Sequence, residues 1–356
     1  MDGYVTRRLW LDRDPQALKD WQTLMQAANL SDQETVDYTI GIYDGARLAA
    51  TGSLDGKILK CLVVCAAYQS ENLLTQVVMA LLERLDQEGL TNRFVYTKPK
   101  NLPYFKALGF RLLAQTEALL FMEQGFPSFQ DYLSYLTQHK VDSSQNGAIV
   151  MNANPFTLGH RYLVEQALSA CDHLYIFVVS EDRSYFSAQD RFKMVQAGVA
   201  DLANVTVLPS RDYMVSQATF PSYFLKERAD LAVAQVQAEL DAQVFKAFIA
   251  PSLEIAIRFV GEEPLSPVTQ VYNQALAQAF GQDLDLKIIP RLEKDGQVIS
   301  ATRVRAAIQA GKPADWLNLV PQSTYHYIQS QDLLTYSHKT YWAKMPREKR
   351  WNKDGN

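Results

Sequence analysis

The chain has 356 residues, of which 47% are apolar and 21% charged, as is ordinary for a globular protein of about two domains. Its formal net charge of −4 argues against broad attraction to nucleic acid or to an anionic membrane. We find no signal peptide and no apolar run of the roughly 18 residues needed to span a bilayer, and therefore expect a cytoplasmic protein. The three cysteines show no metal-ligand spacing, so we expect no metal bound by protein side chains.

The first third of the chain alternates strand and helix patterns. Two hairpin dipeptides, Asp44-Gly45 and Asp55-Gly56, separate three apolar runs that predict an antiparallel meander. In chain order we predict three strands, a helix, a strand, a short helix and a last strand, over residues 38–44, 46–53, 57–68, 70–88, 93–97, 101–108 and 110–122. This order indicates an α+β domain over residues 1–124.

A linker is expected over residues 125–146. It opens with a Gly-Phe-Pro turn at 125–127 and ends in the polar stretch Asp-Ser-Ser-Gln-Asn-Gly. Between them, residues 130–136 have the spacing of a short amphipathic helix.

From residue 147 the pattern changes to apolar strands that alternate with helices. We predict strands over 148–151, 173–180, 204–209, 254–261 and 284–290, and helices over 157–170, 188–202, 225–248, 268–280 and from 302. Such alternation favours a parallel sheet covered on both faces, here over residues 147–335, followed by a basic tail over 336–356. Parallel sheets of this kind bind ligands at the carboxyl ends of their strands.

The turn after the first of these strands reads Asn-Ala-Asn-Pro-Phe-Thr-Leu-Gly-His over residues 152–160. Gly159 lets a ligand approach the backbone, and the free amides of a helix N-terminus attract phosphate oxygens. His160 in the first helical turn can stabilise charge that grows on a phosphoryl group. The alternative is a helix capped by Thr157 with a histidine that only packs.

A second motif, Ile-Ser-Ala-Thr-Arg-Val-Arg, follows the last predicted strand at residues 299–305. Ser300 or Thr302 can cap the next helix, which places Arg303 and Arg305 in its first turn. Cations there oppose the helix dipole, and a polyphosphate ligand would explain them. The alternative is a capped helix whose arginines face solvent.

Together the two motifs resemble the signatures of the nucleotidyltransferase superfamily. Further segments make the chain similar to the citrate lyase ligase family, namely Val-Val-Ser-Glu-Asp at 178–182, Asp-Arg-Phe at 190–192, Ala-Thr-Phe-Pro-Ser-Tyr-Phe at 218–224 and Phe-Val-Gly-Glu-Glu-Pro at 259–264. Upstream, Asn-Leu-Pro-Tyr-Phe-Lys-Ala-Leu-Gly-Phe at 101–110 resembles a segment of GNAT acetyltransferases. The resemblance implies an α/β protein in which an α+β, GNAT-like domain precedes a doubly wound parallel-sheet nucleotidyltransferase domain of the HxGH type.

The GNAT-like segment departs from its superfamily at residues 69–74. The loop that would wrap the pyrophosphate of acetyl-coenzyme A has no glycine there, and Glu71 would repel a pyrophosphate.

The resemblance also implies an activity and its residues. Acetate and ATP would form acetyl-adenylate and pyrophosphate, and the acetyl group would pass to the thiol prosthetic group on the citrate lyase acyl carrier subunit, with Mg²⁺ accompanying ATP. Catalysis is expected from His160, Thr157 and Arg305. Contacts to ATP are expected from Asn152, Asn154, Pro155, Phe156, Gly159, Arg183, Gly261, Ser300 and Thr302.

Three other functions fit parts of the sequence. One is a plain adenylyltransferase that acts on a small phosphorylated substrate such as phosphopantetheine, which would be recognised by a dinucleotide product. A second is a GNAT acetyltransferase with an accessory nucleotide domain, active without ATP. A third is a non-catalytic docking or sensory module, which would keep its function after His160→Ala.

Overall fold

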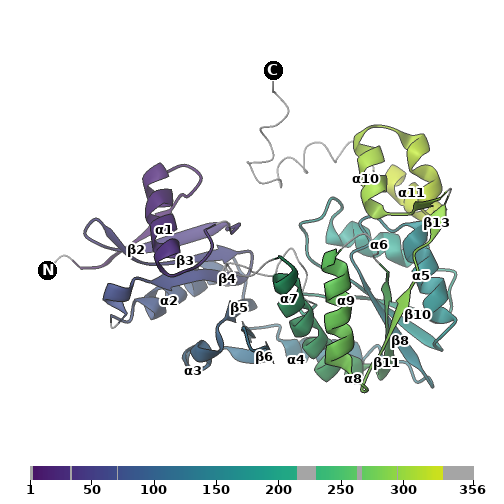
Figure 1. Cartoon of the computed structure of the whole chain (residues 1–356), viewed down its shortest axis with the longest axis horizontal. Helices are drawn as coiled ribbons and strands as arrows, with labels where there is room; N and C mark the ends of the chain where they lie inside the picture. Colours follow the sequence, from purple (N-terminus) through teal and green to yellow (C-terminus); the bar gives the residue numbers. More distant parts are fainter. Residues whose placement is uncertain are drawn as a thin grey trace. The chain divides into compact units, whose positions relative to one another are not determined.

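The computed structural model describes residues 3–32, 34–69, 71–214, 230–262, 267–294 and 296–331 (Figure 1). The basic tail predicted at 336–356 lies outside these ranges. The chain divides into two compact units, formed by the described parts of 1–135 with 220–244 and of 136–219 with 245–356.

The first unit is built on a seven-stranded sheet of order β1-β2-β3-β4-β5-β7-β6. Neighbouring strands are antiparallel except β4 and β5, which run parallel. The strands are β1 (Val5–Leu9), β2 (Tyr38–Asp44), β3 (Arg47–Asp55), β4 (Ile58–Val64), β5 (Arg93–Thr97), β6 (Arg111–Gln115) and β7 (Leu120–Gln124). The helices are α1 (Pro15–Ala27), η1 (Ala66–Tyr68), α2 (Leu73–Gln87), η2 (Pro99–Asn101) and α3 (Leu102–Ala107).

This unit has the α+β organisation that the sequence predicted, with three local differences. Strand β1 and helix α1 were not predicted. The strand predicted at 57–68 ends at Val64, and η1 follows it. The single strand predicted at 110–122 is instead the hairpin of β6 and β7. A turn separates the two strands, in which the Thr116 hydroxyl accepts from the backbone N–H of Ala118 at 3.2 Å and of Leu119 at 3.1 Å.

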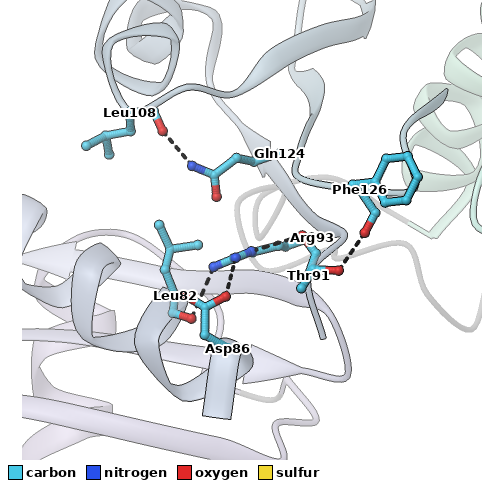
Figure 2. A network of polar contacts seen from close by, with 7 residues as sticks. All are labelled: Leu82, Asp86, Thr91, Arg93, Leu108, Gln124 and Phe126. Atoms are coloured by element: carbon cyan, nitrogen blue, oxygen red, sulfur yellow. Dashed lines mark hydrogen bonds and ion pairs between the residues drawn. The ribbon is translucent and has the colours of Figure 1, made fainter. Parts of the chain in front are cut away.

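Polar contacts connect the end of α2 with β5, and the segment before β5 with the segment after β7 (Figure 2). Arg93 donates from Nη1 to the carbonyl of Leu82 at 3.1 Å and forms an ion pair with Asp86. The Thr91 hydroxyl donates to the carbonyl of Phe126 at 2.5 Å. These contacts hold the strand that pairs with the β6–β7 hairpin against the helix that covers the sheet.

The second unit is built on a five-stranded, wholly parallel sheet of order β10-β9-β8-β11-β12. Its strands are β8 (Asn146–Met151), β9 (His173–Val178), β10 (Val205–Pro209), β11 (Ile255–Gly261) and β12 (Asp285–Ile289), with the short pair β13 (Glu293–Lys294) and β14 (Gln297–Val298). Its helices are α5 (Leu158–Leu168), α6 (Ala188–Gly198), η4 (Phe245–Ile249), α8 (Ala250–Ser252), α9 (Pro267–Phe280), α10 (Ala301–Gln309), η5 (Pro313–Asp315), η6 (Leu317–Leu319) and α11 (Gln322–Ser330).

The central strands β8 and β9 of the parallel sheet are buried on both faces, as their apolar sequences predicted, whereas the edge strand β12 is largely exposed. Ile149 and Met151 of β8 share a core with Val164 of α5 and Met194 of α6. Phe177 of β9 packs instead against Phe245 of η4, with 6.1 Å between the ring centroids. Figure 1 shows α5 and α6 on one side of this sheet and α9 on the other. The chain changes direction between β8 and β11, which confirms the doubly wound prediction.

Contacts place the unit boundaries differently from the linker and domain limits expected at 125–146 and 147–335. The predicted short helix is present as α4 (Phe129–Thr137). Helix α7 (Asp230–Val244), expected within the second domain, groups with the first unit, where the Gln243 side chain accepts from the backbone N–H of Gln115 at 3.2 Å. Periodicity predicts a helix, but it contains no information on which sheet the helix contacts. Among the described residues, no helix is long and apolar enough to cross a bilayer.

Candidate active site

Helix α5 begins with a reciprocal pair of contacts between Thr157 and His160. The Thr157 hydroxyl accepts from the backbone N–H of His160 at 3.4 Å, and the backbone N–H of Thr157 donates to Nδ1 of His160 at 3.0 Å. A backbone N–H can only donate, so Nδ1 is unprotonated. The neutral imidazole therefore carries its proton on Nε2, where it is a hydrogen-bond donor.

His160 is neutral over the physiological pH range. Burial, and then the positive charge of Arg291, lower the pKa of His160 to about 4. A neutral ring cannot act as a cation toward phosphate, but its Nε2–H can donate to an oxygen on which negative charge develops.

A cavity of about 770 Å³ opens at the carboxyl ends of β8, β11 and β12. This volume is in the range of small-molecule sites. The N-termini of α5 and α10 both contribute to its wall. The sequence-predicted site residues that line it are Asn152, Thr157, Gly159, His160, Gly261, Ser300 and Thr302.

Two glycines of the cavity wall differ in their surroundings. A Cβ on Gly159 would lie 3.2 Å from the carbonyl oxygen of Ile299, so the first turn of α5 packs closely on the segment that leads into α10. A Cβ on Gly261 would have no heavy atom within 4 Å and would project into open space. Gly159 therefore permits a close approach of two segments, and Gly261 leaves room at the end of β11.

Four other predicted residues do not line the cavity: Asn154, Pro155, Phe156 and Arg305. Nη1 of Arg305 donates to the carbonyl of Asn154 at 2.6 Å, and Nη2 donates to the Thr302 hydroxyl at 3.0 Å. Phe156 is fully buried and stacks on the ring of His160, with 5.7 Å between centroids. Arg305 thus connects α10 to the loop before α5, and Phe156 supports the imidazole.

Arg183 is exposed and does not line the cavity. The nearby Arg191, within the Asp-Arg-Phe segment at 190–192, is fully buried. Its guanidinium donates to the Asn152 side-chain oxygen at 2.6 Å and to the Val179 carbonyl at 2.6 Å. Arg191 therefore holds the loop after β8 against the loop after β9.

Sequence reasoning missed Arg291, Tyr272 and Asn273, which also line the cavity. For Arg291 a signal was present, because it stands just after Pro290 at the carboxyl end of the last parallel strand. Tyr272 and Asn273 lie inside helix α9, where no sequence pattern separates a cavity residue from a surface residue.

Residues 146–328 match the family model described as the citrate lyase ligase C-terminal domain. The chain is 36% identical over 316 residues to the [citrate [pro-3S]-lyase] ligase of Haemophilus influenzae, a match that covers 86% of this chain and 94% of that protein. It is 40% identical over 288 residues to the enzyme of the same name from Klebsiella pneumoniae, covering 79% of this chain and 84% of that protein.

A shorter match, 30% identical over 150 residues, is to phosphopantetheine adenylyltransferase from Petrotoga mobilis, covering 40% of this chain and 92% of that protein. The matches to the ligases span both units, whereas this one has the length of a single domain. On this evidence, the chain belongs to the citrate lyase ligase family.

Proposed function

We propose that this chain is an AMP-forming acid–thiol ligase that activates citrate lyase. It converts acetate and ATP to acetyl-adenylate and pyrophosphate, and then acetylates the thiol prosthetic group on the citrate lyase acyl carrier subunit with release of AMP. Membership of the ligase family supports the overall reaction. The observation that carries the chemistry is a neutral His160 in a cavity that two helix N-termini also line.

In the first step a carboxylate oxygen of acetate attacks the α-phosphorus of ATP. The new P–O bond forms as the bond to the bridging oxygen of pyrophosphate breaks, and negative charge spreads over the phosphoryl oxygens. Nε2–H of His160 donates to one of these oxygens. Backbone amides at the start of α5, beside Gly159, stabilise the same charge through the helix dipole.

The departing pyrophosphate is held at the start of α10. Ser300 caps this helix by accepting from the backbone N–H of Arg303 at 3.2 Å, and Ser300 and Thr302 both line the cavity. Arg305 acts as a positioning residue, because its guanidinium holds the Thr302 hydroxyl and the Asn154 carbonyl.

Mg²⁺ enters this proposal with the nucleotide. Among the described residues that line the cavity, none carries a carboxylate, so the hard oxygen ligands that Mg²⁺ prefers come from the phosphates and water. The ion screens the charge of the polyphosphate while the anionic acetate approaches.

In the second step the carrier thiolate attacks the acetyl carbonyl; the C–S bond forms as the bond from the acetyl carbon to the phosphate oxygen breaks, and AMP leaves with that oxygen. An adenylyltransferase acting on phosphopantetheine is the weaker candidate, because it leaves the first unit and its match to the ligases without a role.

The test is acetate-dependent exchange of labelled pyrophosphate into ATP, with Mg²⁺ present and the carrier subunit absent. Exchange, followed by AMP release and carrier acetylation once the carrier is added, is the expected result. A chain that stays silent with and without the carrier, but makes a dinucleotide from phosphopantetheine and ATP, would be an adenylyltransferase instead.

A further inference from the structure

The cavity is lined by a cation that the family motifs do not contain. Arg183 and Arg305, the arginines expected to serve the phosphates, lie outside the lining, whereas Arg291 belongs to it. Among the described lining residues, Arg291 is the one Lys or Arg. Among those lining residues, Arg291 is therefore the source of positive side-chain charge for a ligand inside the cavity.

Backbone contacts hold Arg291 in place at the carboxyl ends of β11 and β12. Its Nε donates to the carbonyl of Glu262 at 2.7 Å, and the backbone N–H of Glu262 donates to the carbonyl of Ile289 at 2.8 Å. A guanidinium is planar, so a fixed Nε sets the plane in which the terminal nitrogens meet an anion.

The segment after Arg291 returns directly to the start of α10. The carbonyl of Leu292 accepts from the backbone N–H of Ile299 at 3.1 Å, and Ile299 precedes the helix cap Ser300. Ile299 also contacts the first turn of α5, since its carbonyl lies beside Gly159. Arg291 is thus built into the same framework that brings the two helix N-termini to the cavity.

The charge of Arg291 acts inside the site. Its side chain is half-buried, and burial lowers the pKa of its guanidinium. A cation partly removed from water is stabilised by an anionic ligand. Its field also reaches His160 and is the second cause of the low pKa of that imidazole. Since Arg291 and His160 also line the same cavity, both can meet the same ligand.

We infer that Arg291 is a catalytic residue that binds an anionic oxygen of the reactants beside the imidazole of His160. The oxygen belongs either to the acetate carboxylate or to a phosphate of ATP, and both are recognised by the same planar fork of N–H donors. This inference rests on the proposed function for the identity of the reactants.

The kinetic test compares Arg291→Gln and Arg291→Lys with Lys287→Gln in the exchange assay. Lys287 is a matched control, because it is an exposed cation of β12, four residues earlier, and does not line the cavity. We expect Arg291→Gln to lower kcat/KM by about 10- to 100-fold, Arg291→Lys to recover part of the loss, and Lys287→Gln to stay within about twofold of wild type. A rise confined to the KM for acetate identifies the carboxylate, and a rise in the KM for ATP or a fall in kcat identifies a phosphate.

A binding test separates this inference from the proposed function. Inorganic pyrophosphate is titrated into each protein while the imidazole signal of His160 is followed by NMR, which needs no turnover. We expect wild type to bind pyrophosphate with a shift of this signal. If Arg291 binds a phosphate oxygen, Arg291→Gln should bind pyrophosphate at least about tenfold more weakly and Arg291→Lys between the two; if it binds the acetate carboxylate, the same order is expected when acetate is titrated instead. Without ligand, the pKa of His160 should rise in Arg291→Gln and stay low in Arg291→Lys.

Pyrophosphate binding, His160 titration and kcat/KM that are all unchanged in Arg291→Gln would overturn the role of Arg291. If Arg291→Gln does not fold, the Arg291→Lys variant decides the question. A purely structural role for Arg291 predicts wild-type KM values in the folded Arg291→Lys variant. Absence of exchange and of carrier acetylation in the wild type, with and without the carrier subunit and with the NMR results as expected, would instead contradict the proposed function.

Discussion

The backbone N–H of Thr157 donates to Nδ1 of His160 at 3.0 Å, and the hydroxyl of Thr157 lies 2.9 Å from the same nitrogen. The hydroxyl also accepts from the backbone N–H of His160. The residue that caps helix α5 is therefore the residue that selects the tautomer of the imidazole. Helix initiation and the chemistry of the site share one set of atoms, so a change in one is expected to alter the other.

His160→Ala should lower acetate-dependent exchange by about 100- to 1,000-fold, because it removes a donor aimed at developing phosphoryl charge. The thermal unfolding midpoint should also fall, because the imidazole accepts from the backbone N–H of Thr157 at the start of α5 and stacks on Phe156. His326→Ala is the matched control, since His326 is exposed on α11, outside the cavity, and its loss should leave exchange unaltered. Equal activity in the two variants would remove His160 from the mechanism.

Thr157→Val should lower both stability and exchange, while Thr157→Ser should retain most of each. Valine keeps the shape of threonine but has no hydroxyl to cap the helix or to contact Nδ1, and a lost cap costs about 1 kcal/mol. Chemical denaturation and the exchange assay, run on the same preparations, measure the two effects. Wild-type exchange in Thr157→Val would show that the hydroxyl does not help to orient the imidazole.

The pKa of His160 predicts a pH dependence of stability. It is lowered to about 4 in the folded chain and is ordinary, about 6.5, in the unfolded chain. Between these values the unfolded state binds a proton that the folded state does not, so stability is full above about pH 6.5 and falls as pH drops toward 4. The unfolding free energy of wild type relative to His160→Gln should therefore decrease across this window. A difference that stays constant with pH would contradict the lowered pKa.

Gly198→Ala should lower the stability of the fold, whereas Gly261→Ala should weaken nucleotide binding and keep the fold. A Cβ on Gly198 would meet the ring of Phe156 well inside van der Waals contact, and Phe156 supports His160, so overpacking should destabilise the chain by about 1–3 kcal/mol. A Cβ on Gly261 enters open space in the cavity, so folding should be kept and nucleotide binding weakened. Denaturant unfolding and calorimetric titration with ATP give the two quantities. Wild-type ATP affinity in Gly261→Ala would place the nucleotide away from the end of β11.

Arg191→Met should lower the unfolding free energy by at least about 3 kcal/mol, because buried carbonyl groups would lose their donor. The carbonyls that Arg191 contacts are those of Asn152, Val179, Glu181 and Phe186. Lys193→Met on the exposed face of α6 is the control and should change stability by less than about 0.5 kcal/mol. Similar values for the two variants would mean that the loop after β8 does not depend on Arg191.

Local signals predicted most of the fold. Strand β9 (His173–Val178) was expected because six residues of almost unbroken apolar sequence follow a helix. The strand–helix alternation predicted a parallel sheet, and the doubly wound order was implied by the resemblance to nucleotidyltransferases. Helix α1 was missed although its start is readable, since Asp14 caps it and Pro15 occupies its first turn. The β6–β7 hairpin was missed because the Thr116 turn contains neither glycine nor proline.

The sequence by itself determined the family, the parallel sheet and the two segments that meet at the cavity, because hydrophobic period, helix caps and motif order are local properties of the chain. Tertiary structure alone decided which motif residues line the cavity and which, like Arg305, do not. The strand end at Arg291 is readable in the sequence, but its place in the same cavity as His160, 131 positions earlier in the chain, is not. Proximity, burial and the pKa they produce depend on how distant segments pack, which a local pattern does not encode.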